Sequence, residues 1–539
     1  MHKKQHSGAG FNKHHSPSFQ PQPQASVECA IGELTLSEHD GKLVTVLGSV
    51  DRIIQTSGPT LFVITDGSGI LTMKGFEGAG VRAYPSVNEG HMVKALVEIK
   101  EFSGAMEGEI MKLHLLQGPE AELAKQELKE KERKRATVTA PTFLANSPIL
   151  EKLKDRFVKA ATEIRLAVIQ NRPIIVRHHN DADGYSSGFA IERAIIPLIE
   201  KQHGPGKAAW EYYTRAPCAA PMYEIEDSIK DSATSLRSEA KFSNKMPLVV
   251  IVDTGSGEES LLGIKQGRIH GIEFIVVDHH VFDEKDVTSP ETLVHINPFL
   301  VGEDGAKYSA GMLCTEFARF INPDFNADYI AAMAGLADRI DNKPVMDTYL
   351  SIAEAKGYSK QMMHDIGTMI DFVSAKLRFM EAREYIETVF GEPIEKQKKL
   401  LALLGPYIQN LETKGLAIAE ANAVREKIGN VTLQTLEVEL AFPRGSYPKP
   451  GKCVGMLHDK AQVDLKTDAL VSVGILPDLV TIRATEASGF SVHTFIDKLQ
   501  KELPKAFPNG GGHHLAGAVK FTPTQRENVL KVLRSCIKK

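Results

Sequence analysis

The chain has 539 residues, of which 42% are hydrophobic and 24% are charged, and its formal net charge at pH 7 is -4. This balance is ordinary for a globular protein, and the length allows roughly three to four domains. The small net charge excludes a general polycation, so any surface for nucleic acid must be a local patch.

The five cysteines lie far apart and include no CxxC pair. An odd number without pairing favours a reducing compartment over a disulfide framework. No stretch reaches the roughly 18 apolar residues of a membrane span, and the N-terminus lacks an apolar signal segment. The composition therefore predicts a cytoplasmic protein that has no contact with a membrane.

Residues 1–28 are rich in His, Pro, Gln and Ser and lack the apolar content that offsets the entropy of ordering, so we expect a disordered tail. The irregular spacing of its histidines favours a solvated segment over a metal site.

Residues 30–118 contain five short, alternating apolar runs separated by turn residues, which predicts a small β-barrel. The order of the runs resembles an OB-fold of the kind that binds nucleic acid, with TLFVITDGSG as the second strand and its turn. Such barrels bind single strands by stacking bases on aromatic side chains along a basic groove, for which Phe62, Phe76, Lys74 and Arg82 are candidates. Alternatively, both phenylalanines fill the barrel core.

Residues 119–140 contain AELAKQELKEKERKRA, whose i,i+4 charge pairs predict a solvated helical linker. From 150 to 342, helical segments alternate with continuous β-branched runs, which predicts a parallel sheet covered by helices on both faces. Residues 343–430 have helical spacing throughout and are expected to form an insert or connector. Residues 431–539 are expected to form a last α/β domain.

Polar side chains follow three strands of the predicted sheet directly. They are His179, Asp181 and Asp183 after PIIV, Asp253 after LVVIV, and Asp278, His279 and His280 after FIVV. Ligand sites in parallel sheets form at the carboxyl ends of the strands, so these side chains are expected to meet. If HNDAD stays extended, its alternate side chains point to one site, and Gly184 allows the turn into the next helix.

Burying three histidines and four aspartates together is costly unless cations compensate the charge. Mixed carboxylate and imidazole ligands suit manganese, magnesium or zinc, and the ligands suffice for two ions that share one carboxylate. Two such ions, typically about 3.5–4 Å apart, can activate water and stabilise the attacking and leaving oxygens at phosphorus.

The segments HNDADG, VDTG, VVDHH and GLADR resemble the four motifs of the DHH phosphoesterase superfamily, and GGGHHLAGA resembles the signature of its DHHA1 companion domain. Their order resembles the RecJ-like exonucleases from about 150 to 539, except for the helical insert. The combination with an N-terminal OB-fold is similar to archaeal RecJ-like proteins, relatives of a eukaryotic replicative-helicase subunit.

The resemblance implies ligands for two divalent ions. One ion would be held by His179 and Asp181, the other by Asp183, His279 and Asp338, with Asp253 as the bridge. His280 would face the scissile phosphate, and Asp278 would orient the imidazoles. Asp341, one helical turn from Asp338, is an alternative ligand, and His178 is expected to be a neighbour of the site.

Near the C-terminus, glycines allow backbone N–H groups to approach an anion closely. The resemblance implies that Gly511, Gly512 and His513 grip the substrate phosphate across a cleft, with Arg483 in support. The alternatives are a plain loop and a plain surface arginine. Related modules occur in some tRNA synthetases, so this motif alone leaves the chemistry open.

The sequence thus predicts a metal-dependent hydrolase, a RecJ-like exonuclease that digests single-stranded DNA or RNA in replication or repair. Manganese is the expected cofactor, with magnesium as the alternative. A second hypothesis is a phosphatase or oligonucleotidase for nucleotide bisphosphates or very short oligonucleotides. A third is a replication scaffold that binds helicase-associated, GINS-like proteins through residues 343–430.

Overall fold

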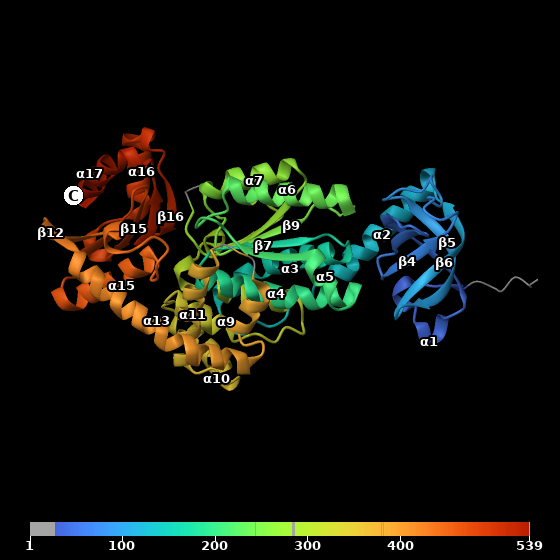
Figure 1. Cartoon of the computed structure of the whole chain (residues 1–539), viewed down its shortest axis with the longest axis horizontal. Coiled ribbons are helices and arrows are strands. Elements are labelled where there is room, and N and C mark those ends of the chain that lie inside the picture. Colours follow the sequence, from blue (N-terminus) through green and yellow to red (C-terminus); the bar gives the residue numbers. More distant parts are fainter. Residues whose placement is uncertain (1–26, 243, 283–285, 379, 381, 538–539) are drawn as a thin grey trace, which may run out of the picture. The chain divides into compact units, whose positions relative to one another are not determined.

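A computed structural model of the chain describes residues 27–242, 244–282, 286–378, 380 and 382–537 (Figure 1). The predicted tail therefore lies outside the described residues, apart from its last two. The chain divides into two compact units, residues 1–128 and 129–539, with the boundary inside helix α2 (Gly118–Ala136). None of the helices among the described residues combines the length and apolar character that a membrane crossing requires.

The N-terminal unit is a closed β-barrel, as the sequence predicts. Its strands are β1 (Val27–Glu28), β2 (Leu43–Gln55), β3 (Thr60–Thr65), β4 (Ile70–Gly75), β5 (Met92–Phe102) and β6 (Ala105–Leu115). The order is β1-β2-β3-β4-β6-β5, and an additional pairing of β2 with β5 closes the sheet. Buried residues alternate with less buried ones along β4 and the first eight residues of β2, because one face of each strand lines the barrel core.

The two phenylalanines that the sequence suggested for base stacking differ in their exposure to solvent. Phe62 is fully buried and belongs to the barrel core, so the stacking role predicted for it is wrong. Phe76 is 70% exposed and remains available.

The larger unit contains a parallel sheet. Its strands are β7 (Ile174–His178), β8 (Tyr213–Pro217), β9 (Leu248–Val252), β10 (Glu273–Val277) and β11 (Val294–Ile296). The order is β11-β10-β9-β7-β8, with every neighbouring pair parallel. The chain passes from β7 to β8 on one side and then to β9 on the other, so the topological switch lies between β7 and β9.

Helices cover both faces of this sheet, which confirms the predicted α/β fold class. The covering helices are α3 (Pro148–Ile169), α4 (Ala182–His203), α5 (Lys207–Tyr212), α6 (Ile225–Phe242), α7 (Glu258–Ile269) and α8 (Ala310–Ile321). Figure 1 shows α6 and α7 on one face and α3 and α4 on the other. Val250 packs in the core on the α3 and α4 side, and its neighbours Val249 and Ile251 pack in the other, which explains the continuous apolar run of β9.

The segment after the sheet is helical. Its helices are α9 (Ile330–Ala337), α10 (Lys343–Ala355), α11 (Lys360–Leu377), α12 (Arg383–Val389) and α13 (Ile394–Asn422). The C-terminal sheet begins at β12 (Val424–Ile428), before the expected start at residue 431, because β12 pairs with the following strand.

The C-terminal sheet is mixed. Its other strands are β13 (Val431–Glu437), β14 (Leu470–Ile475), β15 (Leu479–Ala484), β16 (Asn509–His513) and β17 (Ala516–Lys520), and its helices are α14 (Val438–Ala441), α15 (Pro450–Leu465), α16 (Val492–Glu502) and α17 (Arg526–Ile537). The order is β12-β13-β14-β15-β17-β16, which leaves the glycine-rich strand β16 at an edge.

Candidate metal centre

The segment after β7 turns directly into helix α4. Asp181 is the N-cap residue of α4, and its Oδ1 accepts a hydrogen bond from the Gly184 N–H at 2.9 Å. Asp183 lies in the first helical turn, so the interpretation of HNDAD as an extended segment is wrong. Gly184 is helical, and glycine is needed there because an added Cβ would lie 2.1 Å from the His179 carbonyl oxygen.

Asp253, directly after β9, has a strained backbone and a buried carboxylate. Its φ of 60° lies in the left-handed region, which costs a non-glycine residue on the order of 1–3 kcal/mol and is typical of functional sites. Among the described residues, no group donates a hydrogen bond to its Oδ2, although this oxygen is buried. A buried acceptor without a donor indicates a ligand at this position.

The carboxylate of Asp253 lies between two groups of possible ligands. On one side, Oδ2 lies 3.6 Å from His179 Nδ1, which itself lies 2.8 Å from Asp181 Oδ2. On the other side, Oδ1 lies 3.4 Å from His279 Nε2.

The second side contains two further carboxylates. The Nε2 atom of His279 lies 3.8 Å from Asp338 Oδ2 and 3.9 Å from Asp183 Oδ2. The ligand atoms within each of the groups His179–Asp181–Asp253 and Asp183–His279–Asp338 lie within 4.8 Å of one another, so each group could hold a metal ion. Asp341 is exposed and lies outside both groups. The carboxylate at the site is therefore that of Asp338 and not that of Asp341.

The carboxylates are crowded in a buried site. Burial and the charges of Asp253 and Asp338 raise the pKa of Asp183 well above its usual range. Burial also raises the pKa of Asp338 to about 6, with Asp253 contributing, although His279 acts in the opposite direction. Asp183 is nevertheless held in place, because both of its oxygens accept backbone N–H groups, from Ala310 and Gly311, at the start of α8. A divalent cation would relieve this repulsion.

His280 is oriented by Asp278. Its Nδ1 lies 2.8 Å from Asp278 Oδ1, and the same carboxylate accepts the backbone N–H groups of Ser256, His279 and His280. Burial opposes ionisation of Asp278, but the neighbouring imidazole of His280 keeps the pKa of this carboxyl well below its usual range.

A buried hydrogen-bond chain behind Asp278 was missed in the sequence. His295 Nε2 lies 2.8 Å from Ser256 Oγ, and the Ser256 N–H donates to Asp278 Oδ2 at 3.1 Å. The Asn297 side-chain amide donates to Ser256 Oγ and to the carbonyl of His280, both at 2.9 Å. Ser256 lies in the loop after β9, and His295 lies in the short strand β11, so no regular pattern pointed to them.

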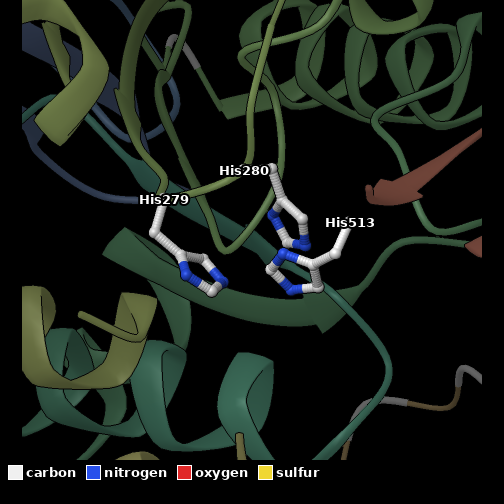
Figure 2. Close-up of side chains that lie close together, drawn as sticks. All are labelled: His279, His280 and His513. Carbon is white, nitrogen blue, oxygen red and sulfur yellow. The ribbon is translucent and has the colours of Figure 1, made fainter. Parts of the chain in front are cut away.

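The C-terminal sheet contributes His513 to the site. Its ring lies 4.7 Å from the ring of His280 and 5.2 Å from that of His279, between centroids, and Figure 2 shows the three side chains together. Burial and the charges of His280 and His279 lower the pKa of His513 to about 2, with Arg483 adding to the effect.

The other predicted phosphate-binding residues lie around His513. Gly511 and Gly512 precede it in β16, and the φ of 126° at Gly512 excludes most other residues. Arg483 is exposed on β15 and forms no ion pair with the part of the chain that the structure describes. His178 is buried beside the site, with its Nδ1 2.7 Å from the His179 carbonyl oxygen, as expected for a neighbour.

Lys449, which directly precedes α15, was also not predicted as a residue of the site. Its ammonium group donates to the carbonyl of Asn180 at 2.7 Å and to Ser374 Oγ at 2.6 Å. This residue therefore ties the C-terminal region to the loop that carries His179 and Asp181.

The chain is similar to known proteins over most of its length, although no family model matches it. It is 33% identical over 523 residues to an uncharacterized protein of Methanocaldococcus jannaschii. This match covers 92% of this chain and 68% of that relative. It is also 33% identical to the solved DHH domain of a member of the s1p family of ribosomal proteins, with a TM-score of 0.73 over 78% of this chain and 98% of that one.

The RecJ of Thermus thermophilus, solved in complex with Mn2+, is 16% identical with a TM-score of 0.51, covering 77% of this chain and 59% of that one. This likeness shows a shared fold. The 33% identity to the DHH-domain structure extends over almost the whole length of that structure. The chain therefore belongs to the DHH family.

Proposed function

We propose that the protein is a metal-dependent phosphodiesterase that removes nucleotides from one end of single-stranded DNA or RNA. The observation that carries this proposal is the position of Asp253, whose two carboxylate oxygens face two separate groups of histidine and aspartate side chains. A shared carboxylate between two ligand sets is the arrangement that a two-metal centre needs.

The donor set fits two divalent ions. The proposed ligands are His179 and Asp181 for one ion, Asp183, His279 and Asp338 for the other, and Asp253 for both. When bound, the ions would activate a water molecule and stabilise the attacking and leaving oxygens at phosphorus. Manganese is the preferred ion because imidazole and carboxylate ligands are mixed, whereas magnesium favours oxygen ligands alone.

The remaining polar groups would hold the substrate. The contact with Asp278 engages Nδ1 of His280, so that in the protonated ring Nε2 can donate to a scissile phosphate. His513 is close to His280 and would bind the same phosphate from the C-terminal sheet, with Gly511, Gly512 and Arg483 beside it. These residues keep the phosphate oriented while the scissile bond breaks.

The barrel would hold the rest of the strand. Phe76 presents an exposed ring on which a base can stack. The Phe102 ring is 58% exposed and is a second aromatic side chain on this unit, although the Lys74 ammonium covers one of its faces, 3.4 Å from the ring centre, and is paired with Glu107. Very small substrates need no such surface, which favours an exonuclease over a phosphatase.

A second candidate function is that of a replication scaffold. Helix α13 leaves Leu403 and Tyr407 exposed, at 72% and 55%, on the helical segment where helicase-associated, GINS-like proteins would dock. The ligands of the metal centre are all present, however, and a scaffold has no need of them.

The test is a digestion time course on single-stranded DNA and RNA labelled separately at each end, with Mn2+ or Mg2+. Asp253→Asn is compared with Asp341→Asn, a nearby exposed aspartate outside both ligand groups. Stepwise, metal-dependent shortening from one end that only Asp253→Asn abolishes is the expected result. Hydrolysis of dinucleotides or a nucleotide bisphosphate alone would instead identify the small-substrate enzyme, and inertness toward all substrates would identify the scaffold.

A further inference from the structure

Three imidazoles converge beside the carboxylate groups (Figure 2). His279 and His280 follow β10 of the parallel sheet, and His513 ends β16 of the C-terminal sheet. One ring nitrogen from each lies within 4.8 Å of the others, so this group could hold a metal ion. It contains no carboxylate, unlike the groups His179–Asp181–Asp253 and Asp183–His279–Asp338.

Two of the three rings are oriented as metal-binding histidines usually are. The Nδ1 atom of His280 lies 2.8 Å from the Asp278 carboxylate, and that of His279 lies 3.4 Å from the carbonyl oxygen of Gly305. An oxygen acceptor at one ring nitrogen fixes the tautomer and leaves the lone pair on the other. The third ring, of His513, is partly buried and makes no hydrogen bond with any of the described residues, so its nitrogens are available to a ligand.

The chemistry of this group differs from that of the proposed two-metal centre. Three neutral imidazoles with an open fourth position form a typical zinc site. Manganese and magnesium prefer the oxygen-rich groups, whereas zinc and the neighbouring nickel and copper ions bind imidazole more tightly. The same cleft therefore offers two ligand sets with different ion preferences.

The two sets cannot be filled together, because they share His279. Its Nε2 atom is the one that faces Asp253 and Asp338, at 3.4 and 3.8 Å, and one lone pair serves one ion. An ion on the three histidines would also occupy His280 and His513, which the phosphate of the substrate would otherwise contact. Zinc–nitrogen bonds of about 2.0–2.1 Å would further draw the three rings together and join the two sheets.

We propose that His279, His280 and His513 form a distinct Zn2+ site whose occupation excludes the ion pair and locks the C-terminal sheet against the parallel sheet. Zinc would therefore inhibit the enzyme. Zinc binding does not depend on the proposed nuclease activity, whereas the inhibition does.

The first experiment measures zinc binding to the full chain by competition with a chromophoric zinc chelator. His513→Gln is compared with His514→Gln, an adjacent exposed histidine that contacts Ser491 instead, and with Asp338→Asn. Because loss of a residue that merely orients a ligand already weakens metal binding about 10–100-fold, we expect His513→Gln to weaken the tightest zinc site by at least that factor. His514→Gln and Asp338→Asn should bind that zinc as the unsubstituted chain does.

Unchanged zinc affinity in His513→Gln would overturn the proposal, as would loss of the tightest zinc site in Asp338→Asn, which would place zinc in the carboxylate group. If His513→Gln fails to fold, as judged by its thermal unfolding, His280→Gln replaces it with the same expected loss. These results hold even if no nuclease activity is found.

The second experiment adds zinc to the manganese-loaded protein and follows digestion relative to each variant's own uninhibited rate. Zinc should inhibit the unsubstituted chain and His514→Gln at a concentration at least about tenfold below that needed for His513→Gln. Equal sensitivity of all three proteins would show that inhibitory zinc binds elsewhere and would overturn the proposed lock. An inactive protein would refute the proposed nuclease but leave the binding result standing.

Discussion

The two walls of the candidate site are built differently. On the wall formed by the ends of β7, β9 and β10, backbone N–H groups hold Asp183 and Asp278, and a strained backbone conformation fixes Asp253. On the wall formed by β16, His513 lies in an edge strand rich in glycine, and its ring lacks hydrogen bonds to the described residues.

The difference suggests that one wall holds the cations and the other receives the substrate strand. A site that holds cations and reacting atoms gains from side chains whose positions are set in advance, and the first wall has them. A group that receives a flexible strand gains from freedom to adjust, which the second wall retains. Substitutions in the first wall should therefore abolish the chemistry, and substitutions in the second should weaken the hold on the substrate.

The largest effect is expected for Asp253→Asn. Removing the shared carboxylate charge should lower kcat/KM by about 10³-fold or more, because groups that act as a unit fail together. Digestion rates with Mn2+ and Mn2+ binding are the measurements, with Asp341→Asn as the control. Retained activity in Asp253→Asn would contradict the two-metal assignment.

His513→Ala should reduce kcat/KM by about 10²-fold, the effect of losing one group that stabilises a developing charge. Because the first wall remains intact, Mn2+ affinity should stay within about twofold of that of the unsubstituted chain, within the usual scatter of such measurements. His514→Ala is the matched control. A large loss of Mn2+ binding in His513→Ala would show that the second wall helps to hold the ion pair.

Lys449→Met tests whether the walls are independent. This change removes the donor to the Asn180 carbonyl and should loosen the loop that carries His179 and Asp181, weakening Mn2+ binding about tenfold. Lys452→Met is the control, since Lys452 pairs with Asp371 and Glu412 instead. Equal Mn2+ affinity in both variants would mean that the loop holds its shape without the C-terminal region.

The sequence predicted those parts of the fold that have long, regular patterns. The barrel strands have an alternating apolar pattern and β7, β9 and β10 contain runs of at least three β-branched or aromatic residues, whereas β8 and the three-residue β11 have Arg215 and His295 between their apolar residues, and they were missed. The HNDAD segment was read as extended because its alternation resembles a strand. Aspartate is a common N-cap residue, however, and Asp181 caps α4, so the helix begins within this segment.

The site residues that follow strand ends or lie in a motif of the DHH and DHHA1 kind were predicted, and the others were not. The sequence predicted Asp338 with Asp341 as the alternative, and the structure decides for Asp338, which follows α9 directly and lies beside His279. Lys449 could not be found, because it contacts a residue 269 positions earlier in the chain. The burial of Phe62 likewise depends on which face of its strand lines the barrel.

An effect of similar size, on kcat in this case, is expected for His295→Leu, which breaks the hydrogen-bond chain behind the first wall. Without its contact to Ser256, Asp278 should orient His280 less well and lower kcat about tenfold, with KM unchanged. His295→Gln retains a hydrogen-bonding group and should recover most of the rate. Equal loss in both variants would indicate that His295 serves the fold and not the orientation of His280.

Phe76→Ala lies outside both walls and should have the smallest effect. Loss of one stacking surface should raise KM for long single strands about fivefold, the low end expected for a single base–aromatic contact, and leave kcat unchanged. Dinucleotides, whose two nucleotides the metal centre and its neighbouring residues would hold, should be hydrolysed equally well by both proteins. Leu47→Ala, an exposed apolar side chain on β2, is the control. An equal rise in KM for dinucleotides would mean that Phe76 acts through the structure of the protein, whereas a selective rise for long strands would identify the barrel as the surface that holds the strand while the two walls cleave it.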